Sequence, residues 1–192
     1  ITDCVERWAK SQGKLPADAK LHRRDVHVVA AGLNHQTWFI KVEWNGIDML
    51  PLMLELFESH PEYAQTEKVR IDVLRRFGYY STESNGHLSE YLPWYRKGPE
   101  KDRYLDDSIW PGGITGGYLQ ACRDTADDYR KNYPLWLSGE LEQITLGERS
   151  HEHGSYIIEA LETGRRYWGC FNVENTGLIT NLPQGCTVEL PC

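Results

Sequence analysis

Two strand-like runs separated by a short turn constrain the fold of this 192-residue chain more than any other feature. Residues 25–31 and 36–44 are apolar in the alternating or continuous manner that is typical of β-strands. The four residues between them, GLNH at 32–35, predict a tight turn, and Asn45-Gly46 is a strong turn signal that ends the second run. The sequence therefore predicts an antiparallel hairpin early in the chain.

Helical segments and further short strands follow the hairpin without a regular order. Apolar residues at helical spacing predict helices at residues 1–12, 49–59, 66–77, much of 102–133, and 151–163. Short runs rich in β-forming residues predict strands at 167–173, 178–181 and 186–190. Regular strand–helix–strand units are missing, so we expect an α+β fold of mixed helices with an antiparallel sheet, as one domain over residues 1–192.

Composition excludes several classes of protein. With 40% hydrophobic and 26% charged residues the chain is typical of a soluble globular protein, and its formal net charge of −7 argues against a nucleic-acid partner. The apolar run at 49–57 is interrupted by Pro51 and Glu55 and is too short to span a membrane. Five cysteines without a CxxC pair indicate reduced thiols, which suits a cytoplasmic protein.

Residues 77–97 (FGYYSTESNGHLSEYLPWYRK) combine aromatic, acidic, hydroxyl and imidazole side chains with neither helical nor strand periodicity. Such a segment is expected to be a loop that lines a sugar pocket, where aromatic faces meet apolar ring surfaces and polar groups meet hydroxyls. A tyrosine-rich loop that caps a core is the alternative. Within the segment, Glu83 and His87 would share a face only in a helix, which Gly86 makes doubtful, and either could be a general base or a hydrogen-bonding group of the loop.

Other polar motifs are ambiguous by themselves. His35 in the hairpin turn is either a hydrogen-bonded turn residue or a metal ligand, and no second ligand lies at a typical spacing. Ser150 and Glu152 are expected at the first turn of a helix, as its N-cap and a first-turn acid, although the HxH pair at 151–153 could also bind metal. The glycine-rich stretch at 112–117 follows no strand and lacks the GxGxxG order, which excludes a dinucleotide loop.

Three stretches taken together resemble the family-four glycoside hydrolases, and within that family the melibiase-type α-galactosidases. They are AGLNHQTW at 31–38, the segment 77–97, and NTGLITNLPQGC at 175–186, followed by Val188 and Glu189. The resemblance implies a fold similar to the C-terminal domain of lactate dehydrogenase. It also implies that this chain is a fragment that lacks the Rossmann domain and one cysteine metal ligand.

The resemblance further implies an unusual hydrolysis of α-glycosides that depends on NAD and Mn²⁺. Members of this family oxidise the sugar at C3, remove the C2 proton, eliminate the leaving group, add water and then reduce the sugar again, and so depart from the usual pair of carboxylates. Mn²⁺ binds the sugar oxygens, NAD exchanges the hydride, and the enzyme is expected to be a homo-oligomer. The alternative is a non-catalytic carbohydrate-binding or assembly module.

Carried over by position, His35 is the metal ligand and Asn34 lies beside the substrate. The position that holds the C2 base in other branches falls on Ser84, a poor base. Glu83, His87 or a metal-bound water would then be the base, with Tyr80 a weaker candidate and Ser84 a substrate-binding residue. Ser150 and Glu152 match a Ser-x-Glu pair that we assign to sugar binding.

Overall fold

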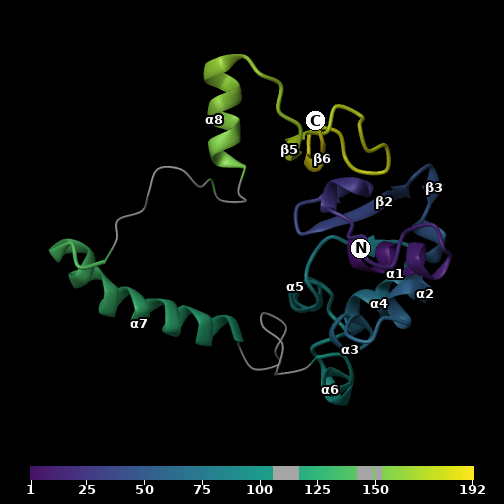
Figure 1. Cartoon of the computed structure of the whole chain (residues 1–192), viewed down its shortest axis with the longest axis horizontal. Helices are drawn as coiled ribbons and strands as arrows, with labels where there is room; N and C mark the ends of the chain where they lie inside the picture. Colours follow the sequence, from purple (N-terminus) through teal and green to yellow (C-terminus); the bar gives the residue numbers. More distant parts are fainter. Residues whose placement is uncertain (106–116, 142–148, 150–152) are drawn as a thin grey trace. The chain divides into compact units, whose positions relative to one another are not determined.

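The computed structural model describes residues 1–105, 117–141, 149 and 153–192 (Figure 1). These fall into two compact units, one within residues 1–115 and 170–192 and the other within 116–169. The larger unit holds the sheet and most of the helices. No helix among the described residues is long and apolar enough to cross a bilayer.

The sheet confirms the expected antiparallel α+β fold. Its strands run in the order β3-β2-β1-β6-β5, with β4 paired to β2 off this path, and every pairing is antiparallel. The bounds are β1 His27–Leu33, β2 Gln36–Trp44, β3 Ile47–Asp48, β4 Tyr80–Ser81, β5 Cys170–Glu174 and β6 Thr187–Pro191. Strands β1 and β2 form the predicted hairpin.

The turn of this hairpin depends on glycine at its base. Gly32 has a φ of 152°, and a Cβ atom added there would lie 2.4 Å from the carbonyl oxygen of Gln36. At the tip, His35 adopts a φ of 61°, in the left-handed region that few non-glycine residues occupy. The expected Asn45-Gly46 turn is confirmed, since both residues also have positive φ and connect β2 to β3.

A β-bulge divides β2 into two halves. Val29 pairs with Lys41 but Ala30 pairs with Phe39, which leaves Ile40 without a partner on β1. The extra residue shifts the alternation of side chains, so that Thr37 before the bulge and Val42 after it are both buried. Strand β2 can therefore contribute to the core at one end and to the site at the other.

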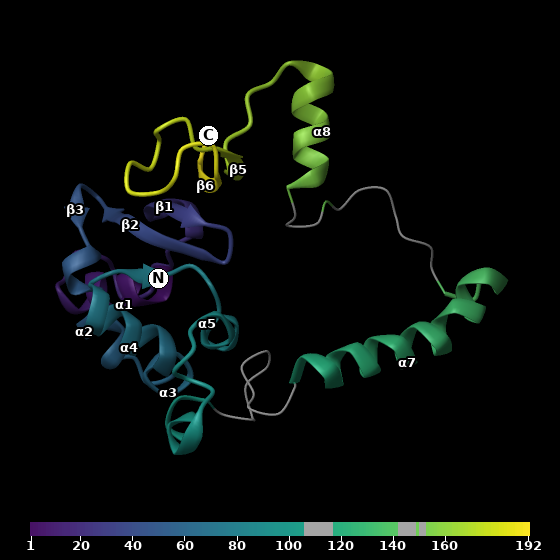
Figure 2. The same cartoon turned by 180° about the vertical axis from the view of Figure 1, so that it is seen from behind.

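Helices cover one face of the β1–β3 part of the sheet in both views (Figures 1 and 2). Their bounds are α1 Thr2–Ser11, α2 Met53–Glu58, α3 Tyr63–Thr66, α4 Lys68–Phe77, α5 Asn85–Tyr91 and α6 Lys101–Tyr104. Single 3₁₀ turns lie at Arg23–Asp25, Leu50–Leu52 and Gly98–Glu100. Buried side chains of α1, α2 and α4 pack with those of β2 and β4 in one core, among them Val5, Met53, Leu74, Val42 and Tyr80.

The second unit contains α7 Gly117–Ser138 and α8 Gly154–Thr163. Helix α8 ends at Gly164 in the left-handed conformation, as expected, but it begins with His153 in the N-cap position rather than Ser150. Ser150 and Glu152 lie outside the described residues, as do residues 112–116 of the glycine-rich stretch.

Three local expectations need correction. The helix expected over 49–59 is confirmed over α2, but Leu50–Leu52 before it form a 3₁₀ turn that contains Pro51. The strand expected at 178–181 is an irregular loop. Here the fully buried Asn175 donates to the carbonyl oxygens of Ile179, Leu182 and Pro183 and accepts from the N–H of Ile179, so a side chain replaces a strand partner.

The third error concerns residues 77–97, which are not a loop throughout. Strand β4 pairs with β2, and helix α5 follows, capped by Ser84, whose hydroxyl oxygen accepts from the N–H of His87 at 3.3 Å. Gly86 is buried within the first turn of α5. The continuous polar block that indicated a loop is thus a helix cap and a first turn.

A buried carboxylate holds α4 to the segment after α5. Asp72 is 5% exposed and accepts from Arg76 Nε at 2.8 Å and from the hydroxyl of the buried Tyr95 at 2.7 Å. Burial by itself would raise the pKa of Asp72, but these hydrogen bonds and the charges of Arg76 and Arg75 outweigh it, so the pKa lies below its usual value.

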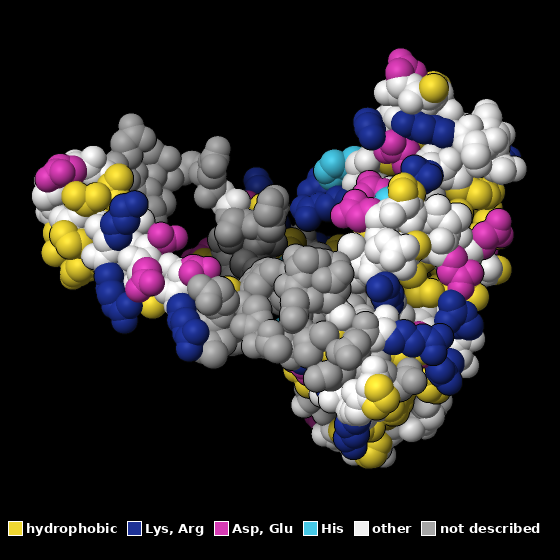
Figure 3. Space-filling view, turned by 90° about the horizontal axis from the view of Figure 1, so that it is seen from below, with side chains coloured by type: hydrophobic (Ala, Val, Ile, Leu, Met, Phe, Trp, Pro, Cys, Tyr) yellow, Lys and Arg dark blue, Asp and Glu magenta, His cyan; other side chains and the backbone are white. Residues whose placement is uncertain are grey.

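Charged side chains of both signs are interspersed on the face of the described residues in Figure 3. Such a mixture is expected of a chain with 21 Lys and Arg against 28 Asp and Glu.

Candidate functional site

The tip of the β1–β2 hairpin carries the histidine that the sequence singles out. Its Nδ1 atom lies 2.6 Å from Oε1 of Glu83, a residue 48 positions later in the chain. The side chain of His35 is 46% exposed and that of Glu83 is 19% exposed. The structure therefore brings together a candidate metal ligand and a candidate base in direct contact.

Helix α4 fixes the segment that carries Glu83. Its first turn donates backbone N–H groups to the side-chain oxygen of Asn85, with the N–H of Val69 at 2.7 Å. Arg70 Nη2 donates to the carbonyl oxygen of Ser81 at 2.8 Å. Ser81 and Asn85, which flank residues 82–84, are thus both hydrogen-bonded to α4. The N–H of Glu83 donates to the Ser81 hydroxyl at 3.2 Å.

Helix α5 places two more rings beside His35. The ring of Tyr91 stacks on that of His35, with centroids 5.3 Å apart and planes 17° apart. The ring of His87 lies 5.8 Å away, centroid to centroid. Nδ1 of His87 contacts Oε2 of Glu90 at 2.8 Å, and the other carboxylate oxygen of Glu90 accepts from Arg96 at 3.3 Å.

The last strand also reaches the hairpin tip. Asn34 Nδ2 donates to Oε2 of Glu189 on β6 at 3.0 Å. Residue type alone does not distinguish Tyr91, Glu90 or Glu189 as site residues. These residues lie in or beside the three stretches that carry the family resemblance, and that position is the sequence evidence that they belong to the site. Local patterns cannot connect them, because they are far apart in the sequence.

The remaining candidates are placed differently. Tyr80 is 1% exposed within the core, and burial raises the pKa of its hydroxyl well above the usual range, so it has no open face toward a substrate. Ser84 uses its hydroxyl to cap α5. Ser150 and Glu152 lie outside the described residues.

His35 has the chemistry of one metal ligand but not of a complete site. With Nδ1 facing a carboxylate, Nε2 is the nitrogen left for a cation, which is the usual arrangement of a ligating histidine. Within the described part of the chain, no three His, Cys, Asp or Glu side chains are grouped so as to hold a metal ion. A cation at His35 would therefore need ligands from the substrate, from water or from other polypeptide.

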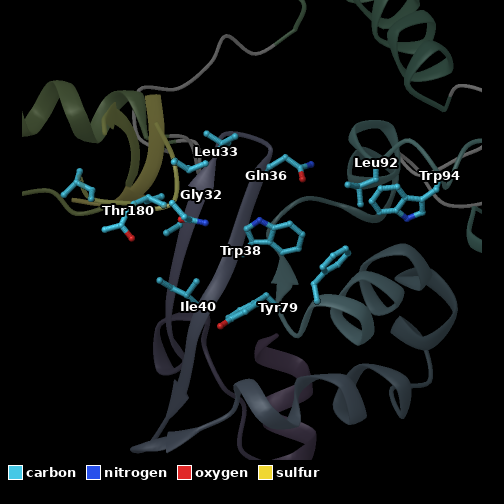
Figure 4. Close-up of a pocket in the computed structure, with 15 residues that line it drawn as sticks. Gly32, Leu33, Gln36, Trp38, Ile40, Tyr79, Leu92, Trp94 and Thr180 are labelled. Atoms are coloured by element: carbon cyan, nitrogen blue, oxygen red, sulfur yellow. The ribbon is translucent and has the colours of Figure 1, made fainter. Parts of the chain in front are cut away.

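A hollow of about 840 Å³ lies directly beside the hairpin tip (Figure 4). Trp38 on β2 faces it, with Leu92 and Trp94 on one side and Thr180 on the other. The size suits a small molecule, and aromatic walls with a few polar groups are typical of sugar sites.

Comparison with known proteins shows the family to which this domain belongs. Residues 30–192 match the C-terminal domain of family 4 glycosyl hydrolases. The chain belongs to this family. It is 50% identical over 169 residues to an alpha-galactosidase of Rhizobium meliloti (strain 1021), a match that covers 87% of this chain and 34% of the relative. The chain thus spans about a third of the length of that curated family member.

Solved structures of this family share the fold. The Bacillus subtilis protein lplD superposes with a TM-score of 0.69 at 24% identity, over 98% of this chain and 43% of that one. A 6-phospho-alpha-glucosidase from gut microorganisms, in complex with NAD and Mn²⁺, gives a TM-score of 0.57 at 17% identity, over 90% of this chain and 40% of that chain. The resemblance to family-four glycoside hydrolases is confirmed.

Proposed function

We propose that this chain is the metal- and sugar-binding part of an enzyme that hydrolyses α-galactosides with the help of NAD and Mn²⁺. The observation that carries the proposal is the contact between His35 at the hairpin tip and Glu83, in a chain that belongs to family 4. The 50% identity to an alpha-galactosidase supports the choice of sugar, and the NAD and Mn²⁺ in a related structure support the cofactors.

Each residue at the tip has a proposed role. His35 would bind Mn²⁺ through Nε2, and Asn34, already oriented by Glu189, would bind a sugar hydroxyl. His87 and Glu83 are the candidates for the base that takes the C2 proton, because both are partly exposed beside His35, whereas Tyr80 is buried. Bound Mn²⁺ would polarise the sugar oxygens and bound NAD would accept and return the hydride.

Substitution of the metal ligand tests the proposal most directly. In the full-length protein we expect His35→Ala to abolish Mn²⁺-dependent turnover of an aryl α-galactoside, because even changes next to a ligand cost about 10–100-fold in metal affinity or activity. Calorimetry with Mn²⁺ and turnover assays measure the two effects. A Mn²⁺ affinity within a few-fold of wild type would contradict the proposal.

The isolated chain of 192 residues is expected to be inactive. Hydride transfer requires the acceptor to lie in contact with the sugar, and the sequence contains no nucleotide-binding motif to hold it. Turnover of the same aryl α-galactoside by this chain alone would contradict that expectation. Sugar binding without turnover in the full-length protein would instead support the alternative, a carbohydrate-binding module that uses the hollow of Figure 4.

We also propose that the full-length protein is a cytoplasmic homo-oligomer. All five cysteines are unpaired in the structure, which suits a reducing compartment. Helix α7 exposes a stripe of large apolar side chains at helical spacing, namely Tyr129, Tyr133, Trp136 and Leu137. Such a stripe is typical of helices that pack against a partner. Light scattering after size-exclusion chromatography would measure the oligomeric state.

A further inference from the structure

We propose that Glu83 is a positioning residue for His35 rather than the base that attacks the sugar. It would hold the imidazole with its proton on Nδ1 and the lone pair of Nε2 free for a divalent cation. This inference rests on the proposed function, in which His35 is a metal ligand. It assigns to Glu83 a different role from the one that the sequence suggested.

The contact between Glu83 and His35 determines which ring nitrogen carries the proton. An ionised carboxylate can only accept hydrogen bonds, so a separation of 2.6 Å between Oε1 of Glu83 and Nδ1 of His35 requires the proton on Nδ1. In the neutral ring the other nitrogen, Nε2, then carries the lone pair. A metal ligand requires that form, and the nitrogen that is protonated is set by the partner of the other one.

The contact is built rather than incidental. Glu83 is held from both sides by Arg70 and Val69 of α4, which bind Ser81 and Asn85. His35 is held by its left-handed backbone and by the stacked ring of Tyr91. The left-handed conformation of His35 is set by the hairpin turn and fixes the direction in which its ring leaves the backbone.

His87 makes the same type of contact. Its Nδ1 lies 2.8 Å from Glu90, but this pair is three residues apart in one helix, and Arg96 shares the carboxylate. The His35–Glu83 pair instead joins two segments that are far apart in the sequence. Among the ion pairs of the described residues, no lysine or arginine contacts Glu83. Protonation of Glu83 would weaken its acceptance of the proton on His35 Nδ1, which favours His87 or a metal-bound water as the base.

The tautomer of His35 can be measured on the 192-residue chain itself. Long-range ¹H–¹⁵N correlation spectra of histidine-labelled protein, at a pH where the rings are neutral, are expected to show His35 protonated at Nδ1. In Glu83→Ala the ring should change toward protonation at Nε2. In Glu83→Gln the amide oxygen can still accept, so Nδ1–H should be retained. Glu90→Ala is the matched control, because it should alter His87 and leave His35 unchanged.

Mn²⁺ alone provides the second readout. Paramagnetic broadening of the His35 ring signals should appear in the wild-type chain, and the concentration required should rise about 10–100-fold in Glu83→Ala. The signals of His60, whose Nδ1 already accepts from two backbone N–H groups, report that each variant is folded. If Glu83→Ala misfolds, Glu83→Gln supports the proposal by retaining both readouts and contradicts it by losing the Nδ1–H form.

The outcomes separate this inference from the proposed function. An unchanged tautomer and an unchanged Mn²⁺ response in folded Glu83→Ala would overturn the role of Glu83 alone. Absence of broadening at His35 in the full-length protein at millimolar Mn²⁺ would overturn both. In the full-length enzyme, exchange of the C2 hydrogen with deuterium oxide gives an independent result, and it should persist in Glu83→Gln. Loss in His87→Gln would identify His87 as the base, and persistence there would identify the metal-bound water. Loss in Glu83→Gln alone would return the role of base to Glu83.

Discussion

Asp72 and Glu83 are both carboxylates with short contacts, but they lie in very different surroundings. Asp72 is buried between helices, and Arg76 and Tyr95 donate to it. Glu83 lies at the partly exposed hairpin tip and its side chain contacts a histidine that is half exposed. The first carboxylate is itself buried and accepts from the buried Tyr95 and from an exposed arginine, whereas the second leaves one histidine nitrogen available to a ligand.

The comparison teaches that a short carboxylate contact does not by itself indicate function. A buried carboxylate is stabilising only when all of its partners are present, since an unpaired buried charge is costly. An exposed pair contributes little to stability, typically 0–1 kcal/mol, so its geometry is better explained by what the open nitrogen binds. Stability measurements should therefore separate the two carboxylates.

The largest effect is expected from Asp72→Ala. Removal of this side chain leaves the buried hydroxyl of Tyr95 without its partner and separates α4 from the segment after α5. The loss of hydrogen bonds to a charged group should lower the free energy of unfolding by about 1.5–3 kcal/mol. Urea denaturation followed by circular dichroism measures it. A loss below half a kilocalorie would mean that Asp72 is as dispensable as a surface carboxylate.

Acid should destabilise the wild-type chain through the carboxylates whose pKa values are lowered in the folded state. The pKa of Asp72 is lowered in the folded state, and hydrogen bonds from Lys10, Leu21 and Lys20 lower the pKa of Glu6 to about 2. Depressed pKa values stabilise the fold above the pKa of the unfolded carboxyl, near 4, and this contribution is lost as the pH falls toward the folded value. The midpoint of thermal unfolding should thus fall between about pH 4.5 and pH 2. The slope should be smaller in Asp72→Ala, and an equal slope in both proteins would contradict this account.

The smallest effect on stability is expected from Glu83→Gln. The amide can keep the contact with His35, and the pair is partly exposed, so the free energy of unfolding should change by about 0.5 kcal/mol or less. Denaturation under the same conditions as for Asp72→Ala provides the measurement. A loss comparable with that of Asp72→Ala would show that the tip is a structural element, and would remove the distinction between the two carboxylates.

Local patterns were sufficient for the elements that local interactions determine. The hairpin, α1 and α4 followed from turn residues and apolar spacing, and the C-terminus of α8 followed from a glycine. Helix α5 was missed because its cap and first turn read as one polar block. The loop at 178–181 was taken for a strand because its hydrogen bonds come from the side chain of Asn175, which no periodicity reveals.

The site was only partly predictable for a related reason. His35 and Glu83 were each recognisable as chemically capable residues, but their contact joins positions 48 apart. Residue types alone did not decide whether His35 is a metal ligand or a turn residue, or whether Glu83 is a base or a hydrogen-bonding group of the loop. The family resemblance selected His35, while the orientation of Glu83 depends on how α4 binds Ser81 and Asn85, a contact that single-sequence patterns do not contain.

The pairing of β1 with β6 has a consequence for how the chain folds. Gly32 pairs with Glu189 across 157 positions, and Asn34 meets the same residue. Closing so long a loop is entropically costly and tends to be slow. The edge of β1 that pairs with β6 therefore stays unpaired until β6 has formed. During synthesis the hairpin tip would remain incomplete until nearly the whole of this chain had been made. Any competence of the tip to bind a ligand should therefore appear only after β6 has paired with β1.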